Sequence, residues 1–258
     1  MKKGFTLVEL SIVLVIIGLL ISGVLVAQSL IQSAKINSLV SQIEQYHILT
    51  ATFEDRYRSL PGDLPTAGAL FGGQCGGNCL TSRNSSNPCA NGRGTGVINR
   101  ISSGNQGELR SVLCHLSKGL EFGKDFELAP RTGGGDSDED WILGTHYAET
   151  PFSEVALGFN GTGSTNALLL GRYRYAIRVS RTAAFGNPAN NQVLLNGAFT
   201  PEVALSIDRK LDDGLASGGE VRAGDGRTLS GNGCFSGNDY RVSLSEEDCY
   251  INSYRIVN

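Results

Sequence analysis

The chain has 258 residues and a formal net charge of −3 at pH 7, from 22 basic and 25 acidic side chains. A charge this small provides no general electrostatic attraction for nucleic acid, so we expect no nucleic-acid partner. The length allows a membrane anchor plus one large or two small globular units, and the 34 glycines favour a loop-rich head over a tight helical bundle.

The first predicted element is an apolar run over residues 4–26, directly after Lys2 and Lys3. About 20 apolar residues suffice for a helix to cross a bilayer. The positive-inside rule keeps the two lysines in the cytoplasm and puts the head across the membrane. Glu9 lies near the start of the run, and a carboxylate in lipid costs roughly 2.5–3.5 kcal/mol at the centre of a span and less near its end. A charge retained in so apolar a segment indicates a function.

A cleaved secretory signal is the alternative interpretation of this run. Such a signal has an apolar core of roughly 7–15 residues, followed by a cleavage site made of small residues. Here the run is longer, no A-x-A sequence closes it, and the small residue Gly4 precedes it. A cut between Gly4 and Phe5 would leave the apolar segment on the mature protein.

The sequence G-F-T-L-V-E-L over residues 4–10 resembles the processing site of type IV prepilins and type II secretion pseudopilins. The resemblance implies that a prepilin peptidase cuts between Gly4 and Phe5 and methylates the new amine of Phe5. It also implies that Glu9 neutralises that amine on an adjacent subunit and sets the register of assembly. The alternative is a tolerated charge that snorkels toward water.

The run continues into an amphipathic segment, and no proline or glycine interrupts residues 24–60. Steps of three and four residues produce one mostly apolar stripe, so we expect a single helix from Phe5 to Arg58 whose second half lies on a folded head. A dimeric coiled coil is the alternative, but residues 60–63 (L-P-G-D) stop the helix abruptly and lead into a long domain. The stripe consists of Ile36, Leu39, Ile43, Tyr46, Thr50, Phe53 and Tyr57.

Beyond the long helix, residues 64–107 are rich in glycine, asparagine and serine and predict a long cross-linked loop, and residues 108–120 predict a short amphipathic helix. Residues 172–180 alternate as a half-buried antiparallel strand. We expect one face of this strand to hold Tyr173, Tyr175, Ile177 and Val179, and the opposite, solvated face to hold Arg172, Arg174 and Arg178.

Thr200 and Pro201 predict the N-cap and first residue of a helix of about ten residues. Residues 221–223 and 250–257 predict the last strands. The expected fold is therefore α+β: a long N-terminal helix packed on an antiparallel sheet, with disulfide-linked loops. Its divisions are a leader over residues 1–4, a transmembrane half-helix over 5–28, an amphipathic half-helix over 29–58, and a periplasmic or extracellular head over 59–258.

Six cysteines fit an exported head, because disulfides form in that compartment. Locality favours a Cys234–Cys249 bridge and pairing among the other four, although six cysteines allow fifteen complete pairings. Metal ligation is the alternative, but no histidine lies at zinc-finger spacing from the first three cysteines. The first four are Cys75, Cys79, Cys89 and Cys114.

Two acidic clusters are calcium candidates, although we otherwise expect no cofactor. Asp136, Asp138 and Asp140 have the D-x-D-x-D spacing of calcium loops, but Trp141 stands where an EF-hand needs glycine. The second cluster flanks a predicted helix end, where carboxylates are unfavourable against the helix dipole. It consists of Asp208, Asp212 and Asp213. Turn formation and solubility are the alternative explanation of both clusters.

The sequence does not predict an enzyme. The three histidines, His47, His115 and His146, lie at no spacing that joins a nucleophile to a base. The glycines of residues 92–96 lack the preceding strand and following helix of a phosphate-binding loop. A DNA-uptake role for the arginines of the 172–180 strand is a further alternative, but a solvated strand face is the favoured explanation.

Segments beyond the anchor also resemble a subgroup of large bacterial prepilin-like proteins: residues 42–46 and 53–57 of the long helix, and residues 60–63 and 204–223 of the head. The resemblance implies a structural subunit of a type IV pilus-like filament or secretion pseudopilus, held in the bacterial inner membrane as a single-pass protein with its head in the periplasm before it assembles. The implied partners are the prepilin peptidase, other pilin or pseudopilin subunits, and the assembly platform. Many major pilins carry proline where this chain has Val26, so the alternative is a minor pilin that binds a surface, DNA or an exported substrate.

Overall fold

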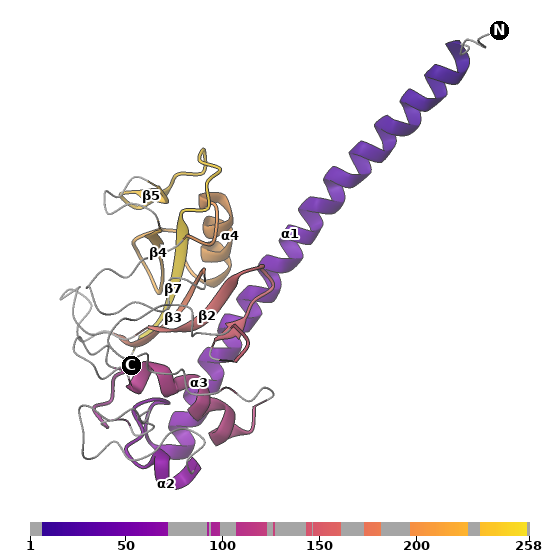
Figure 1. Ribbon diagram of the computed structural model, residues 1–258. Coiled ribbons are helices and arrows are strands. Elements are labelled where there is room, and N and C mark those ends of the chain that lie inside the picture. The colour runs from indigo at the N-terminus through magenta and orange to yellow at the C-terminus, as the bar shows by residue number, and fades with distance from the viewer. Residues whose placement is uncertain are drawn as a thin grey trace, which may run out of the picture.

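The computed structural model describes residues 7–71, 92, 94–98, 107–122, 126, 143–145, 147–160, 173–181, 197–226 and 233–256. One long helix, α1 (Leu7–Tyr57), runs the full height of the molecule, and the head lies against its C-terminal half (Figure 1). The N-terminal half of α1 projects beyond the head as a free rod.

α1 contains 51 residues and has no break, as the sequence predicts, because no proline interrupts it. The stop signal at residues 60–63 lies just beyond its C-terminal end. At 1.5 Å per residue it is about 75 Å long. The predicted stripe faces the head, and only its last member, Tyr57, stays partly exposed. The helix-on-head arrangement is thereby confirmed.

The head contains an antiparallel five-stranded sheet in the order β1-β2-β3-β7-β4, which confirms the α+β class. A separate two-stranded hairpin joins β5 (Phe235–Ser236) and β6 (Asp239–Tyr240). The strands of the main sheet are β1 (Ala148–Glu149), β2 (Val155–Asn160), β3 (Tyr173–Arg181), β4 (Val221–Asp225) and β7 (Cys249–Ile256).

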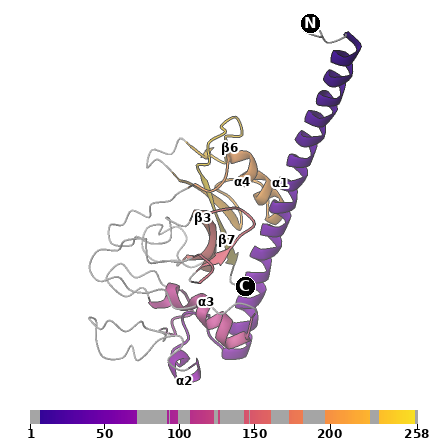
Figure 2. The same cartoon turned by 45° about the vertical axis from the view of Figure 1, so that its right-hand side comes forward.

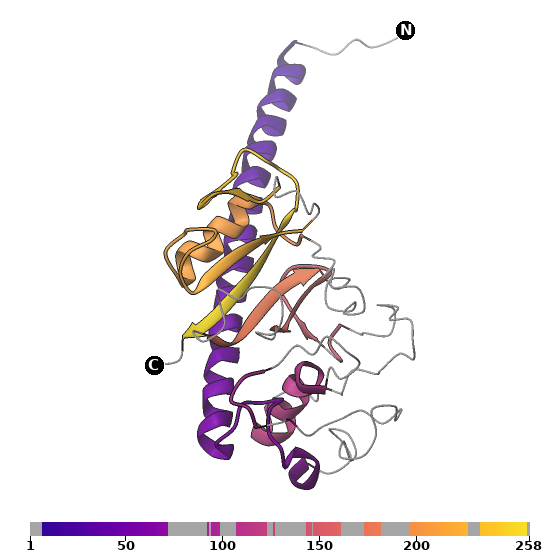
Figure 3. The ribbon, with the colours of Figure 1, turned by 90° about the vertical axis from the view of Figure 1, so that its left-hand side faces the viewer.

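The core lies between α1 and one face of the sheet. Leu157, Ile177 and Ile251 come from three neighbouring strands and are fully buried with Leu39 and Ile43 of the helix. Helix α4 (Pro201–Leu211) lies beside both α1 and the C-terminal strands (Figures 2 and 3). Burial of this apolar face, at about 25 cal/mol per Å² of apolar surface, holds the rod on the head.

The local helix predictions are confirmed. α3 (Gly107–Leu120) occupies the predicted short helix, and α4 begins as expected, with the Thr200 hydroxyl accepting a hydrogen bond from the Val203 N–H. Within the region expected to be a loop, however, residues Ala67–Phe71 form a short helix, α2. The prediction also omitted β2, because its residues 155–159 are buried on both faces and show no alternation.

The predicted faces of β3 are partly wrong. The register shifts between Tyr173 and Ala176, so β3 carries one extra residue relative to β7. Such a bulge moves the flanking side chains to new faces. Tyr173 therefore packs on Tyr254 of the outer face, while Arg174 reaches α1 on the inner face. Arg178 does lie on the outer face, but it is buried rather than solvated.

Candidate functional site

The N-terminal half of α1 is the first candidate functional surface. Among the residues that the structure describes, α1 is the one helix long and apolar enough to cross a membrane, and its most apolar window has a mean hydropathy of 3.0. Its large side chains from Leu7 to Ile31 are 45–84% exposed. A continuous uncovered apolar surface of this length fits a membrane anchor.

Two charged residues bracket this surface. Glu9 is exposed in the first turn of α1, and the next ionisable residue along the helix is Lys35. The helical rise between them is about 39 Å, close to the roughly 40–45 Å thickness of a bilayer with its headgroups. Gly4 and Phe5, the predicted processing residues, lie outside the described residues.

Serine hydroxyls within the apolar segment are satisfied by the helix itself. Ser11, Ser22 and Ser29 each donate a hydrogen bond of 2.9 Å to the carbonyl three residues earlier. An internal partner of this kind lowers the cost of placing a hydroxyl in hydrocarbon. The carbonyl that Ser29 uses belongs to Val26, and the helix is unbroken there.

The head holds α1 partly through a buried histidine. His47 lies between the helix and the sheet, with Nδ1 3.0 Å from the Tyr175 hydroxyl and Nε2 2.9 Å from the Ser253 hydroxyl. Sequence reasoning assigned no role to this histidine. Its spacing was an available signal, because His47 stands four residues after Ile43 and three before Thr50, on the edge of the buried stripe.

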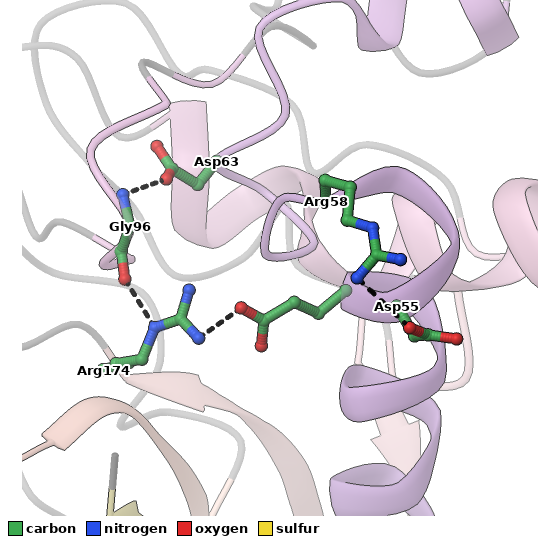
Figure 4. Close-up of polar contacts among 6 residues, drawn as sticks. Asp55, Arg58, Asp63, Gly96 and Arg174 are labelled. Atoms are coloured by element: carbon green, nitrogen blue, oxygen red, sulfur yellow. Dashed lines mark hydrogen bonds and ion pairs between the residues drawn. The ribbon is translucent and has the colours of Figure 1, made fainter. Parts of the chain in front are cut away.

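A polar network fixes the C-terminal end of α1. The Asp63 carboxylate accepts hydrogen bonds from the Thr95 and Gly96 N–H groups, at 3.0 and 2.7 Å. The Gly96 carbonyl in turn accepts a bond of 2.7 Å from Arg174 Nε, and the same guanidinium pairs with Glu54 of α1 (Figure 4). The turn that stops the helix therefore also ties it to β3.

Helix α3 closes this end of the core. The Gly119 carbonyl accepts hydrogen bonds from the Tyr57 hydroxyl and Arg56, at 2.9 and 3.0 Å. His115, which is fully buried, accepts a bond of 2.8 Å at Nδ1 from the Gly62 N–H. His47 and His115 thus both serve as structural hydrogen-bonding groups, and His146 lies outside the described residues.

In the part of the chain that the structure describes, the cysteines form disulfides. Cys234 and Cys249 are bridged, so the pairing expected from locality is confirmed. Cys114 is also disulfide-bonded. Cys75, Cys79 and Cys89 lie outside the described residues.

One of the two acidic clusters can be described. Asp208, Asp212 and Asp213 place carboxylate oxygens within 4.8 Å of one another, so they could share one ion. Each carboxylate nevertheless already accepts a hydrogen bond: Asp208 from Tyr240, Asp212 from the Val221 N–H and Asp213 from the Leu215 N–H. These hydrogen bonds give the cluster a structural role, because its carboxylates stabilise the turn after α4. The other candidates, Asp136, Asp138 and Asp140, lie outside the described residues.

Asp208 is the unusual member of the cluster because it is fully buried. The pKa of its carboxyl is raised to about 6: burial raises it most, the hydrogen bonds from Tyr240 and Gly214 lower it, and the charges of Asp213 and Asp212 raise it. The Tyr240 hydroxyl donates a bond of 2.7 Å to this carboxyl, and burial with the Asp208 contact raises the tyrosine pKa as well.

Two arginines on the outer face of the sheet make contacts within the head. Arg178 is 9% exposed, donates 2.8 Å to Asn252 and lies over the Tyr250 ring. Arg222 lies over the rings of Tyr173 and Tyr254. Both guanidinium groups are thus engaged in internal cation–π contacts, and Arg172 lies outside the described residues.

Comparison with known proteins identifies the N-terminal segment. Residues 1–25 match the prokaryotic N-terminal methylation motif, the cleavage and methylation segment of type IV prepilin-type proteins. Proteins with this motif are structural subunits rather than enzymes, and the motif supports a pilin-like or pseudopilin-like precursor. No curated protein and no solved structure is significantly similar to the chain.

Proposed function

We propose that the chain is a structural subunit of a type IV pilus-like filament or a secretion pseudopilus. The observation that carries this proposal is the coincidence of the methylation motif with a free apolar half-helix, whose other half is bound to a folded head. A protein that is only anchored to the membrane does not need its transmembrane helix to continue into a folded head. A subunit that leaves the membrane to join a polymer needs an apolar helix that can exchange lipid for neighbouring helices.

In this proposal a prepilin peptidase cuts between Gly4 and Phe5 and methylates Phe5. Before assembly the subunit crosses the inner membrane once, with its head in the periplasm. After assembly the exposed side chains of α1 pack against other subunits, while Glu9 faces the amine of a neighbouring Phe5. A carboxylate opposite an amine in a low-dielectric helix bundle would set the register, because any other register leaves a charge without its counterion.

The test is the substitution Glu9→Val in the intact chain. We expect membrane insertion to remain normal and the amount of subunit in a sheared filament fraction to fall steeply. Glu44→Val is the matched control, since Glu44 is an exposed carboxylate on the same helix outside the apolar segment. Mass spectrometry of the mature N-terminus tests processing separately. Unchanged incorporation of the Glu9 variant would contradict the proposal.

A minor pilin with a binding head is the second candidate. It is favoured by Val26, which leaves α1 unbroken where many major pilins carry proline, and by a head fastened by disulfides. The two candidates differ in copy number. Antibody label along the whole filament supports a shaft subunit, whereas label at tips or in a few copies supports the binding module.

A further inference from the structure

A groove of about 340 Å³ lies where α1 leaves the head. This volume is within the range of small-molecule sites. The buried side chains of Ala198, Phe199 and Val203 form its floor, and Phe152 stands beside them. The α1 wall consists of Gln28, Ile31, Gln32 and Lys35, which lie on one face of the helix because their spacing is i, i+3, i+4, i+7.

The groove lies at the height of a lipid headgroup. If Glu9 marks one membrane interface, about 20 residues, from Leu10 to Ser29, fill the roughly 30 Å hydrocarbon layer. Lys35 then lies about 9 Å further on, just beyond a headgroup layer of roughly 5–7 Å, and its flexible side chain can reach back to the phosphates. Ile31 lies closer to the hydrocarbon and is exposed.

On the α1 wall, which also carries Gln28 and Gln32, the apolar Ile31 precedes the basic Lys35, in the order of the acyl chains and the phosphate of a phospholipid. Ile31 offers an apolar surface toward the acyl chains. Lys35 offers a cation toward the phosphate; its ammonium is 5.9 Å from the centre of the Phe152 ring, and none of the described ion pairs uses it. On the side of the groove opposite α1, the N-terminal end of α4 at Thr200 contributes the positive end of its helix dipole. Glu247 on the rim is compensated by its pair with Arg181.

We infer that this groove binds a phospholipid of the outer leaflet of the inner membrane, with the phosphate on Lys35 and an acyl chain along Ile31. The bound lipid holds the head of the unassembled subunit against the membrane surface in one orientation. This inference rests on the membrane-anchored stage of the proposed function. It assigns the groove to the stage before polymerisation, since extraction of α1 into a filament removes the lipid.

The experiment uses the full chain reconstituted in vesicles of phosphatidylethanolamine and phosphatidylglycerol, with the photo-crosslinker p-benzoylphenylalanine in place of Phe152 or, in a second variant, of Gln32. After irradiation, intact-mass spectrometry separates lipid adducts from subunit dimers. We expect lipid adducts at both positions. The control position is Leu70 of α2, which is exposed at the opposite end of the head (Figure 1) and should yield no lipid adduct.

Lys35→Gln should reduce the adduct yield roughly fivefold, because one lysine near an anionic membrane surface contributes about 1 kcal/mol, and Lys35→Arg should preserve it. Three results would overturn the inference: dimers in place of lipid adducts, equal lipid labelling at Leu70, or a yield unaffected by Lys35→Gln. Because the chain is inserted but unassembled, the result does not depend on polymerisation. Normal filaments without lipid adducts in the groove would contradict this inference alone. Lipid adducts without filaments would contradict only the proposed function.

Discussion

Arg174 of β3 pairs with Glu54 of α1, and this contact joins the sheet to the last turns of the rod. Both side chains are partly buried, and the guanidinium also donates to the Gly96 carbonyl. The loop that carries Gly96 is in turn held by Asp63 of the turn after α1. The helix end, the turn, the loop and the sheet therefore form one connected polar unit.

Breaking this unit should destabilise the head. We expect Arg174→Met to lower the free energy of unfolding by about 1–2 kcal/mol, because it removes a charge-assisted hydrogen bond and leaves Glu54 without its cation. Denaturant unfolding of the chain in detergent measures the change. Asp55→Asn is the control, since both side chains of the Asp55–Arg58 pair are more than 80% exposed and the pair should contribute less than about 0.5 kcal/mol. Equal effects of the two variants would contradict the assignment.

His47 should matter more than its exposed neighbour on the helix. We expect His47→Ala to cost about 3 kcal/mol, because it opens a cavity and removes the partner of two buried hydroxyls. Ile48→Ala is the matched control, since Ile48 is 62% exposed. Thermal unfolding monitored by circular dichroism compares the two variants. A small effect at His47 would show that its two hydrogen bonds contribute little to holding the helix on the head.

Asp208 should make stability fall as pH rises through the mildly acidic range. Its folded pKa is about 6 against an ordinary value of 3.8, so the folded state binds the proton more tightly than the unfolded state does. The resulting stability is complete below about pH 4 and is lost as pH rises through 6. The loss is on the order of 3 kcal/mol. The free energy of unfolding is measured against pH for the wild type and for Asp208→Asn, and the difference between the two curves isolates this contribution from other carboxyl groups. A difference that does not change with pH would contradict the prediction.

Calcium should leave the head unchanged if the cluster of Asp208, Asp212 and Asp213 is only a support for the turn. We expect equal melting temperatures in calcium and in chelator, because the three carboxylates already accept hydrogen bonds from the chain. A calcium-dependent rise that disappears in Asp213→Asn would instead establish a metal site. Asp213 suits this test because it is the most exposed of the three and its loss leaves the buried Asp208–Tyr240 contact intact.

Much of the fold could be predicted because its signals are local. The stripe of α1, the Thr200 cap of α4 and the short spacing of Cys234 from Cys249 each depend on residues close together in the chain. The faces of β3 could not be predicted in full, since a bulge is a relation between two strands and leaves no trace in the alternation of one of them. The bridging role of His47 was missed because its partners, Tyr175 and Ser253, are more than 120 positions away.

The candidate sites divide in the same way. The motif at residues 4–10 and the apolar length that follows it are properties of one continuous segment, so sequence alone determined that this chain carries the methylation motif and an apolar helix long enough to cross a membrane. Only the tertiary structure decided that the carboxylates around Asp208 are shared with a turn and a tyrosine, and that Lys35 borders a groove. These features arise where separate elements meet, and the packing that brings them together depends on the whole core rather than on any one segment.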